Sequence, residues 1–222
     1  MKLVTFQTKK AVETLKHKGM LCADVKYIDL QKYALPYDWI IREMKSKHIV
    51  PKNGEKYPIW AWAKCGAFTA PRKRKNCSGI KQDKVKIIFE KPDDEVLLSD
   101  YMAYSFWLNG QIVPKTKEEY LKFLQTMRCK GIDLEGLKDF VRGKKTSPEI
   151  IKIMPKIQQT WRRIFDLKSE VYQACVWNIK MSEVKAIELL DDPKYVYGSM
   201  NAKRSNGSRQ NWRRRYLHFL PD

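Results

Sequence analysis

The chain has 222 residues, of which 43% are hydrophobic and 12% aromatic, so it can bury a core that a disordered chain could not. Lysines and arginines total 44 against 25 aspartates and glutamates, giving a net charge of +19. Such an excess attracts polyanions, and we therefore expect nucleic acid as a partner. No apolar run approaches the roughly 20 residues that span a membrane, and residues 1–10 lack the apolar stretch of a signal peptide. We expect a cytoplasmic protein without a membrane partner.

The first part of the chain alternates strands and helices. Residues 2–7 alternate as in a strand, and Thr8 can cap a helix directly after it. An amphipathic helix is predicted over 35–47, because apolar residues recur there at helical spacing. An aromatic strand over 56–64 follows, and we expect it to pair with a strand over 84–92.

The middle of the chain is mainly helical. Ser99 is expected to end a short strand and to cap the helix that follows. Thr116 and Glu119 have the spacing of a capping box ahead of another helix. Ser147 is expected to cap a later helix, whose apolar stripe continues to Phe165.

Near the end, residues 170–180 are apolar on both faces, which is typical of a central strand. Trp161 and Trp177 continue apolar stripes, and we expect both to be buried. Strands, then helices, then strands predict an α+β fold with a mixed or mainly antiparallel sheet and a helical middle section. We expect a single domain over residues 1–190 and a basic C-terminal extension over 191–222.

Basic residues gather in two segments that contain no interleaved acids. One segment follows the aromatic strand, and the other is in the C-terminal extension. Because a solvated helix face usually mixes acids with bases, we interpret the first segment as a protruding loop that meets phosphates. The candidate nucleic-acid-binding residues are Arg72, Lys73, Arg74, Lys75, Lys203, Arg204, Arg209, Arg213, Arg214 and Arg215.

A second group of residues is a candidate ligand pocket. Trp60 and Trp62 share one face of the aromatic strand, Tyr57 lies near its start, and Gln7 and Thr8 lie at the end of the first strand. The tryptophans are either core residues or a stacking wall for a nucleobase or nicotinamide. For Gln7 and Thr8 the alternatives are capping and strand pairing, or hydrogen bonds to a ligand.

Metal and phosphate-loop chemistry has little support. The five cysteines are odd in number and scattered, which fits a reducing compartment. Cys65 and Cys77 are twelve positions apart with no histidine nearby, so we expect no zinc site and no other metal. Neither G-x-x-x-x-G-K-[ST] nor G-x-G-x-x-G occurs, which argues against P-loop and Rossmann nucleotide sites.

Several blocks of the sequence resemble a bacterial family. The blocks VTFQT, YPIWAWAK, VKIIFEKPDDEVLLSD, WLN and WRRIFDLKSEVYQACVWNI occur in order across about residues 1–190. They are similar to the domain of unknown function 3841, and VLLSD and YQACVW are the most specific of them. The resemblance implies kinship without an assigned chemistry. Ser105 stands where the resemblance leads us to expect a histidine, so no catalytic role is transferred there.

The order of elements also resembles, more faintly, the opening of the ADP-ribosyltransferase fold. That resemblance implies NAD held by the opening strand and an aromatic element, with a late-strand glutamate that stabilises an oxocarbenium-like sugar. The late strand here carries the neutral Gln173, with Glu170 three residues earlier. Asp100, from an acidic cluster at a helix start, is a further candidate. The candidate catalytic residues are thus Gln173, Glu170 and Asp100, and NAD is the possible cofactor.

Three functions remain open on this basis. The first is contact with nucleic acid through the basic loop and extension, together with a ligand pocket. The second is an NAD-dependent ADP-ribosyl transfer to nucleic acid or protein. The third is docking on an acidic protein partner, as in conflict between phage and host.

Overall fold

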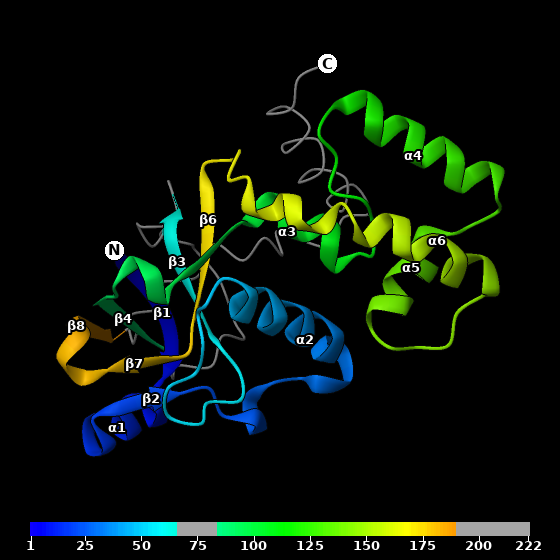
Figure 1. Cartoon of the computed structure of the whole chain (residues 1–222). Helices are drawn as coiled ribbons and strands as arrows, with labels where there is room; N and C mark the ends of the chain where they lie inside the picture. The colour runs from blue at the N-terminus through cyan, green and yellow to red at the C-terminus, as the bar shows by residue number, and fades with distance from the viewer. Residues whose placement is uncertain (66–83, 190–222) are drawn as a thin grey trace, which may run out of the picture. The chain divides into compact units, whose positions relative to one another are not determined.

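The computed structural model describes residues 1–65 and 84–189, which Figure 1 shows in colour. These residues divide into two units, which we call unit 1 and unit 2. Unit 1 contains residues 1–24, 44–65, 84–98 and 170–189, and unit 2 contains residues 25–43 and 99–169.

The single domain predicted over 1–190 stays a prediction, because two compact units can still unfold in one cooperative step. The predicted extension over 191–222 lies outside the described residues. Within the part of the chain that the structure describes, no helix combines the length and the apolar character needed to cross a membrane.

The chain is an α+β protein, as predicted, and its main sheet has the strand order β5-β6-β3-β1-β4-β8. β1 pairs antiparallel with β3 and with β4, β3 pairs antiparallel with β6, and β4 with β8. The six strands are β1 (Lys2–Thr8), β3 (Ile59–Cys65), β4 (Lys84–Glu90), β5 (Leu97–Asp100), β6 (Val171–Val176) and β8 (Val184–Leu189).

The predicted pairing of the aromatic strand with the strand over 84–92 is wrong. β1 lies between β3 and β4, and Val4 is opposite both Trp62 and Ile88. Residues 66–83 separate β3 from β4 in the sequence, which is far longer than the two to five residues of a hairpin loop. Proximity in sequence therefore did not impose the pairing, and β1 took the central place.

A second, two-stranded sheet in unit 1 joins β2 (Met20–Cys22) to β7 (Asn178–Lys180). The strand predicted over 170–180 is therefore two strands, β6 and β7, which belong to different sheets and divide at Trp177. The indole Nε1 of Trp177 donates a hydrogen bond to the Ile49 carbonyl at 3.0 Å. This contact fixes the chain at the point where it changes sheets.

One face of the main sheet forms the core of unit 1, against α1 (Lys9–Lys18). Ile59 and Ala61 belong to this face, so the intervening Trp60 and Trp62 take the opposite face and are half-buried there. The two tryptophans are not residues of this core, and their role on the opposite face stays a prediction. The buried core residues are Leu3, Val12, Leu15, Leu21, Ile59, Ala61, Val85, Ile87, Phe89, Val96, Ala174, Val176 and Ile179.

Unit 2 is helical and its core is rich in aromatic residues. Trp39 stacks on Phe165 with ring centroids 5.8 Å apart, and Trp107 is completely buried. Trp161 is 4% exposed and Trp177 of unit 1 is 6% exposed, which confirms the prediction that both are buried. The α-helices outside unit 1 are α2 (Leu30–Ser46, which continues into unit 1), α3 (Tyr101–Leu108), α4 (Lys117–Cys129), α5 (Leu134–Val141) and α6 (Pro148–Gln158).

Short 3₁₀ turns complete the described elements: η1 (Val25–Tyr27), η3 (Asp93–Glu95), η4 (Trp161–Phe165) and η5 (Met181–Glu183).

Most of the predicted helix caps are confirmed. Thr8 Oγ1 accepts a hydrogen bond from the Ala11 amide at 3.1 Å, and Ser147 caps α6 with Pro148 at its first position. Thr116 caps α4, as predicted. The Glu119 carboxylate, however, accepts a hydrogen bond from the amide of Lys115, whereas a capping box would have it accept from the amide of Thr116.

Two of the predicted helix boundaries are wrong. Asp100, not Ser99, caps α3, because β5 continues one residue further and the Asp100 carboxylate accepts from the first helical amides. The apolar stripe to Phe165 is not one helix, since α6 ends at Gln158. There the Thr160 hydroxyl donates to the Ile157 carbonyl at 2.7 Å and accepts from the Val113 amide at 2.9 Å, which ends the helix.

Candidate functional site

The basic residues predicted to contact nucleic acid lie outside the described residues. Arg72, Lys73, Arg74 and Lys75 fall in the segment 66–83. Lys203, Arg204, Arg209, Arg213, Arg214 and Arg215 fall in the segment 190–222. Their part in binding stays a prediction.

The predicted ligand-pocket residues are divided between the two faces of the main sheet. Trp62 is opposite Gln173 on β6 and opposite Val4 on β1, so these three residues share a face. Gln7 belongs to the other face with Thr5, and its Nε2 donates to Thr5 Oγ1 at 2.9 Å. The structure therefore brings together Trp62 and Gln173, but not Gln7.

The remaining predicted pocket residues are near this aromatic face or in a cap. Trp60 is opposite Cys175 and shares the face of Trp62, while Tyr57 precedes β3 and is half-buried. Thr8 has a structural role as the cap of α1. The Oε1 atom of Gln173 is buried and receives no hydrogen bond from any described residue. Ligand binding on this face, including NAD, stays a prediction.

The candidate carboxylates Asp100 and Glu170 have contrasting surroundings. Asp100 is 1% exposed, and its Oδ1 accepts from the amides of Met102 and Ala103 at 2.9 and 3.1 Å and from the Ser169 hydroxyl at 2.8 Å. Its Oδ2 accepts from the Ser169 amide at 2.6 Å. Four donors leave this carboxylate little capacity for a substrate, so Asp100 is a structural link within unit 2. Glu170 is exposed.

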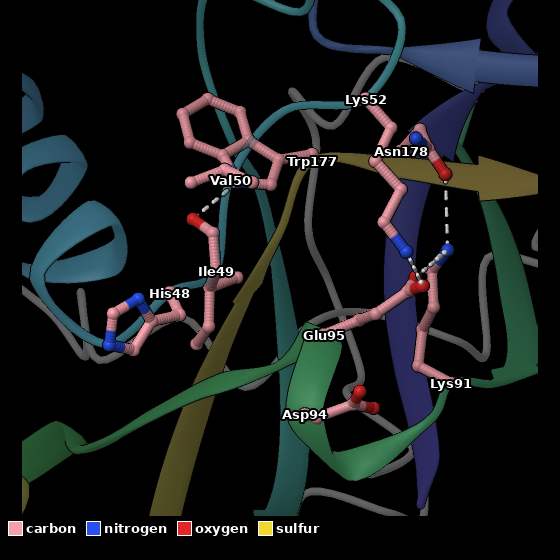
Figure 2. A pocket seen from close by; sticks show the side chains of 9 residues that line it. All are labelled: His48, Ile49, Val50, Lys52, Lys91, Asp94, Glu95, Trp177 and Asn178. Carbon is pink, nitrogen blue, oxygen red and sulfur yellow. Dashed lines mark hydrogen bonds and ion pairs between the residues drawn. The ribbon is translucent and has the colours of Figure 1, made fainter.

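Unit 1 contains a cavity of about 80 Å³, which we call the Lys91 cavity. Figure 2 shows the ammonium groups of Lys52 and Lys91 both pointing toward the carboxylate of Glu95. The ring of Trp177 lies apart from this group and lines another part of the cavity. The residues that line the cavity are His48, Ile49, Val50, Lys52, Lys91, Asp94, Glu95, Trp177 and Asn178.

Three separate segments of unit 1, residues 48–52, 91–95 and 177–178, place these side chains. Lys91 directly follows β4, Glu95 ends η3, and Trp177 stands between β6 and β7. His48 lies beyond the end of α2 with φ of 62°, and the next amide, that of Ile49, donates back to the Met44 carbonyl at 2.9 Å. A left-handed residue in this position is a usual helix ending, so the backbone of His48 has a structural explanation.

The ammonium group of Lys91 is 1% exposed and is fully hydrogen-bonded. Its Nζ donates to Glu183 at 2.8 Å, to the Asn178 Oδ1 at 3.0 Å and to Glu95 at 3.3 Å. An ammonium has three hydrogens, and these three acceptors use all of them. Lys91 is therefore a structural cation, held in place between β4, η3 and the β6–β7 junction.

Hydrogen bonds hold two carboxylates of this cluster, Glu55 and Glu95, in their ionised form. Burial alone would raise the pKa of Glu55, but hydrogen bonds from the Asn178 amide and from the backbone and side chain of Asn53 outweigh it and lower the pKa to about 2. The hydrogen bond from Lys52, at 2.7 Å, lowers the pKa of Glu95, and Lys91 adds to this effect. The carboxylates of Glu55 and Glu95 thus each accept hydrogen bonds from donors within the cluster.

This arrangement stabilises a structure and is poorly suited to catalysis. Lys91 has no hydrogen or lone pair to offer a substrate, and a volume of about 80 Å³ is well below the 300–1,000 Å³ of small-molecule sites. No cluster of three or more metal-binding side chains occurs among the residues that the structure describes.

Comparison with known proteins gives one result. The family model described as "Domain of unknown function (DUF3841)" matches residues 2–185. The chain belongs to this family. No curated protein and no solved structure matches the chain.

The DUF3841 match confirms the resemblance predicted from the sequence blocks, and it covers the Lys91 cavity and the helices of unit 2. It ends before the predicted extension over 191–222. None of these comparisons supports the ADP-ribosyltransferase resemblance. Ser105, where a histidine was expected, donates from its hydroxyl to the Met102 carbonyl at 2.6 Å and so completes a turn of α3.

Sequence reasoning missed the Lys91 cavity altogether. Lys91 is separated from Asn178 and Glu183 by more than eighty positions of sequence, and neither spacing nor charge pattern connects it to them. The sequence around Lys91, with Glu90 before it and Pro92, Asp93 and Asp94 after it, has the pattern of an exposed turn, so no local signal marked Lys91 as buried.

Proposed function

We propose that this DUF3841 protein binds nucleic acid through contacts with the phosphate backbone that do not read base sequence. The observation that carries the proposal is a set of exposed lysines in unit 2, namely Lys145, Lys152 and Lys156. None of the three forms an ion pair with any described residue. Cations without acidic partners are available to phosphates, and the net charge of +19 adds a general attraction.

Other lysines of unit 2 differ in this respect. Lys122 on α4 pairs with Glu118 at 2.8 Å, and Lys144 after α5 pairs with Asp139 at 2.8 Å. Such pairs lose part of their attraction for an external anion, because a carboxylate already lies beside each ammonium.

α6 presents its lysines on one outer face. Ile150, Met154 and Ile157 are the buried side of this helix, whereas Lys152 and Lys156 are one turn apart and exposed. The acid of the helix, Glu149, lies in its first turn, where hydrogen bonds from its own backbone and from Ser147 lower its pKa, and the charge of Lys152 adds to this effect. Glu149 is thus a neighbour of Lys152 but forms no ion pair with it.

The proposal is tested by salt titration of DNA and RNA binding. Replacing Lys145, Lys152 and Lys156 with glutamine should weaken binding by a similar factor for all sequences, because phosphate contacts carry no base information. On duplex DNA the slope of log K against log salt should flatten by roughly two to three, at about 0.9 per phosphate contact.

The matched control removes the same charge from paired lysines. In the variant Lys122→Gln, Lys144→Gln, Lys185→Gln, each altered residue is exposed and ion-paired, so its slope should change much less. Equal effects of the two triple variants would mean that net charge, and not this face, governs binding. Absence of wild-type binding to DNA and RNA at low salt would contradict the function and favour an acidic protein partner.

The basic segment outside the described residues is tested in the same titration. Replacing Arg72, Lys73, Arg74 and Lys75 with alanine should flatten the slope by roughly two to four, with little effect on folding. An unchanged slope would place the phosphate contacts elsewhere on the chain.

A further inference from the structure

Unit 2 contains a cavity of about 170 Å³ that the proposed function does not use. We call it the Arg142 cavity. It lies between α2, which contributes Tyr33 and Pro36, the end of α3, which contributes Asn109, and the end of α5, which contributes Lys138 and Arg142. All of these residues belong to unit 2.

The charge in this cavity is positive. Of the nearby acids on α5, Glu135 pairs with Lys138 and Asp139 pairs with Lys144 at 2.8 Å. Arg142 makes no ion pair with any described residue, and its charge contributes to lowering the pKa of both acids. One cation is thus left over after the pairs are formed.

The cavity also presents hydrogen-bond donors. The Arg142 guanidinium carries five N–H groups in a fixed fork, and the Asn109 Nδ2, which donates to the Ser105 carbonyl at 2.6 Å, has a second hydrogen. The carbonyls that end α5 are occupied, because those of Lys138 and Asp139 accept from the Arg142 amide. Pro36 and Val141, both buried, add apolar walls.

We propose that the Arg142 cavity binds a terminal phosphate group, the phosphomonoester at the end of a nucleic acid strand. A monoester has three unsubstituted oxygens and carries up to two negative charges, which suit a guanidinium fork. About 170 Å³ is too small for a nucleotide by comparison with ordinary ligand sites, but a phosphate at a chain end projects and can enter it. An internal phosphodiester, with a sugar on each side, cannot project in this way. The inference rests on the proposed function and adds that the protein prefers a nucleic acid strand with a phosphate at its end.

The test compares single-stranded oligonucleotides of one sequence that carry a 5′-phosphate, a 3′-phosphate or hydroxyls at both ends. Fluorescence anisotropy with an internal label should show about tenfold tighter binding of wild-type protein to one phosphorylated form than to the hydroxyl form. In Arg142→Gln this preference should disappear, while Arg142→Lys should keep part of it because charge remains and the fork is lost. The matched control Arg128→Gln removes an exposed arginine of α4 that does not line the cavity, and it should keep the full preference.

The outcomes separate this inference from the proposed function. Equal affinity of the wild type for all three oligonucleotides would overturn the inference and leave backbone binding intact. If no oligonucleotide binds, the proposed function fails. Calorimetry with a nucleoside monophosphate then tests independently whether the Arg142 cavity binds a phosphomonoester. Binding that Arg142→Gln removes would then support a phosphomonoester site, and absence of binding would overturn it. Should Arg142→Gln fail to fold, Arg142→Lys carries the same comparison.

Discussion

Both cavities are lined by basic side chains, but they differ in how these cations are satisfied. Lys91 in unit 1 meets Glu183, Asn178 and Glu95, and each of its hydrogens has an acceptor. Arg142 in unit 2 lines the larger cavity and makes no ion pair with any described residue. A cation whose partners are complete holds elements together, whereas a cation without them is available to a ligand. Whether a cation already has its full set of acceptors, more than the presence of a cavity, therefore separates a structural cluster from a candidate site.

The largest expected effect is on Lys91. Lys91→Met leaves the half-buried carboxylates of Glu95 and Glu183 without their buried cation and should lower the free energy of unfolding by about 3–5 kcal/mol, as measured by urea denaturation. The control Lys52→Met removes a partner of the same Glu95, but Lys52 is 64% exposed, so its unfolding curve should match the wild type. If the urea unfolding curve of Lys91→Met matched that of the wild type, the structural role assigned to Lys91 would be wrong.

The second prediction compares the two units through their tryptophans. Trp177 lines the Lys91 cavity and Trp161 belongs to the aromatic core of unit 2. Alanine at either position should cost about 3–5 kcal/mol in thermal or urea unfolding, because each leaves a large void. Wild-type stability of either variant would show that its side chain does not support its unit.

The third prediction concerns acid. The pKa of Glu55 is about 2 in the folded protein and 4.5 ordinarily, so its ionised form stabilises the fold above pH 4.5, and that contribution is lost as the pH falls toward 2. Between pH 5 and pH 2 the wild type should lose on the order of 3 kcal/mol more stability than Glu55→Gln, which cannot titrate. Parallel stability profiles for the two proteins would show that the hydrogen bonds to Glu55 do not favour its ionised form.

The smallest effect is expected at Arg142. Arg142→Gln should change the free energy of unfolding by less than about 0.5 kcal/mol, because no ion pair with a described residue is lost. Calorimetric melting of this variant beside Lys91→Met measures the contrast directly. A loss of stability as large as that of Lys91→Met would mean that Arg142 supports the fold, and it would contradict the contrast drawn between the two cations.

Local features of the fold could be predicted from the sequence. The caps at Thr8, Thr116 and Ser147 depend on residues three positions apart, and the buried Trp161 and Trp177 follow from periodicity over a single segment. Family membership was likewise predicted, from blocks that occur in order.

Features that depend on distant residues could not be predicted. The pairing of β1 with both β3 and β4, and the contact of Lys91 with Glu183, join segments whose spacing in sequence carries no signal. The Arg142 cavity is intermediate. The Glu135–Lys138 pair of α5 follows helical spacing and could have been derived, but the convergence of α5 with Asn109 and Tyr33 depends on packing.

The strand order of the main sheet has a consequence for folding during synthesis. β1 and β3 are synthesised early, but the other neighbour of β3 in the sheet is β6. Gln173 of β6 pairs with Trp62 of β3 across more than a hundred positions of sequence. At about 5–20 residues per second, a nascent chain waits several seconds between making β3 and making β6. Pairings of such high contact order also form slowly once both strands exist. The helical segment 99–169, which is continuous in sequence, can gain structure on the ribosome first, and the sheet of unit 1 should close only after it.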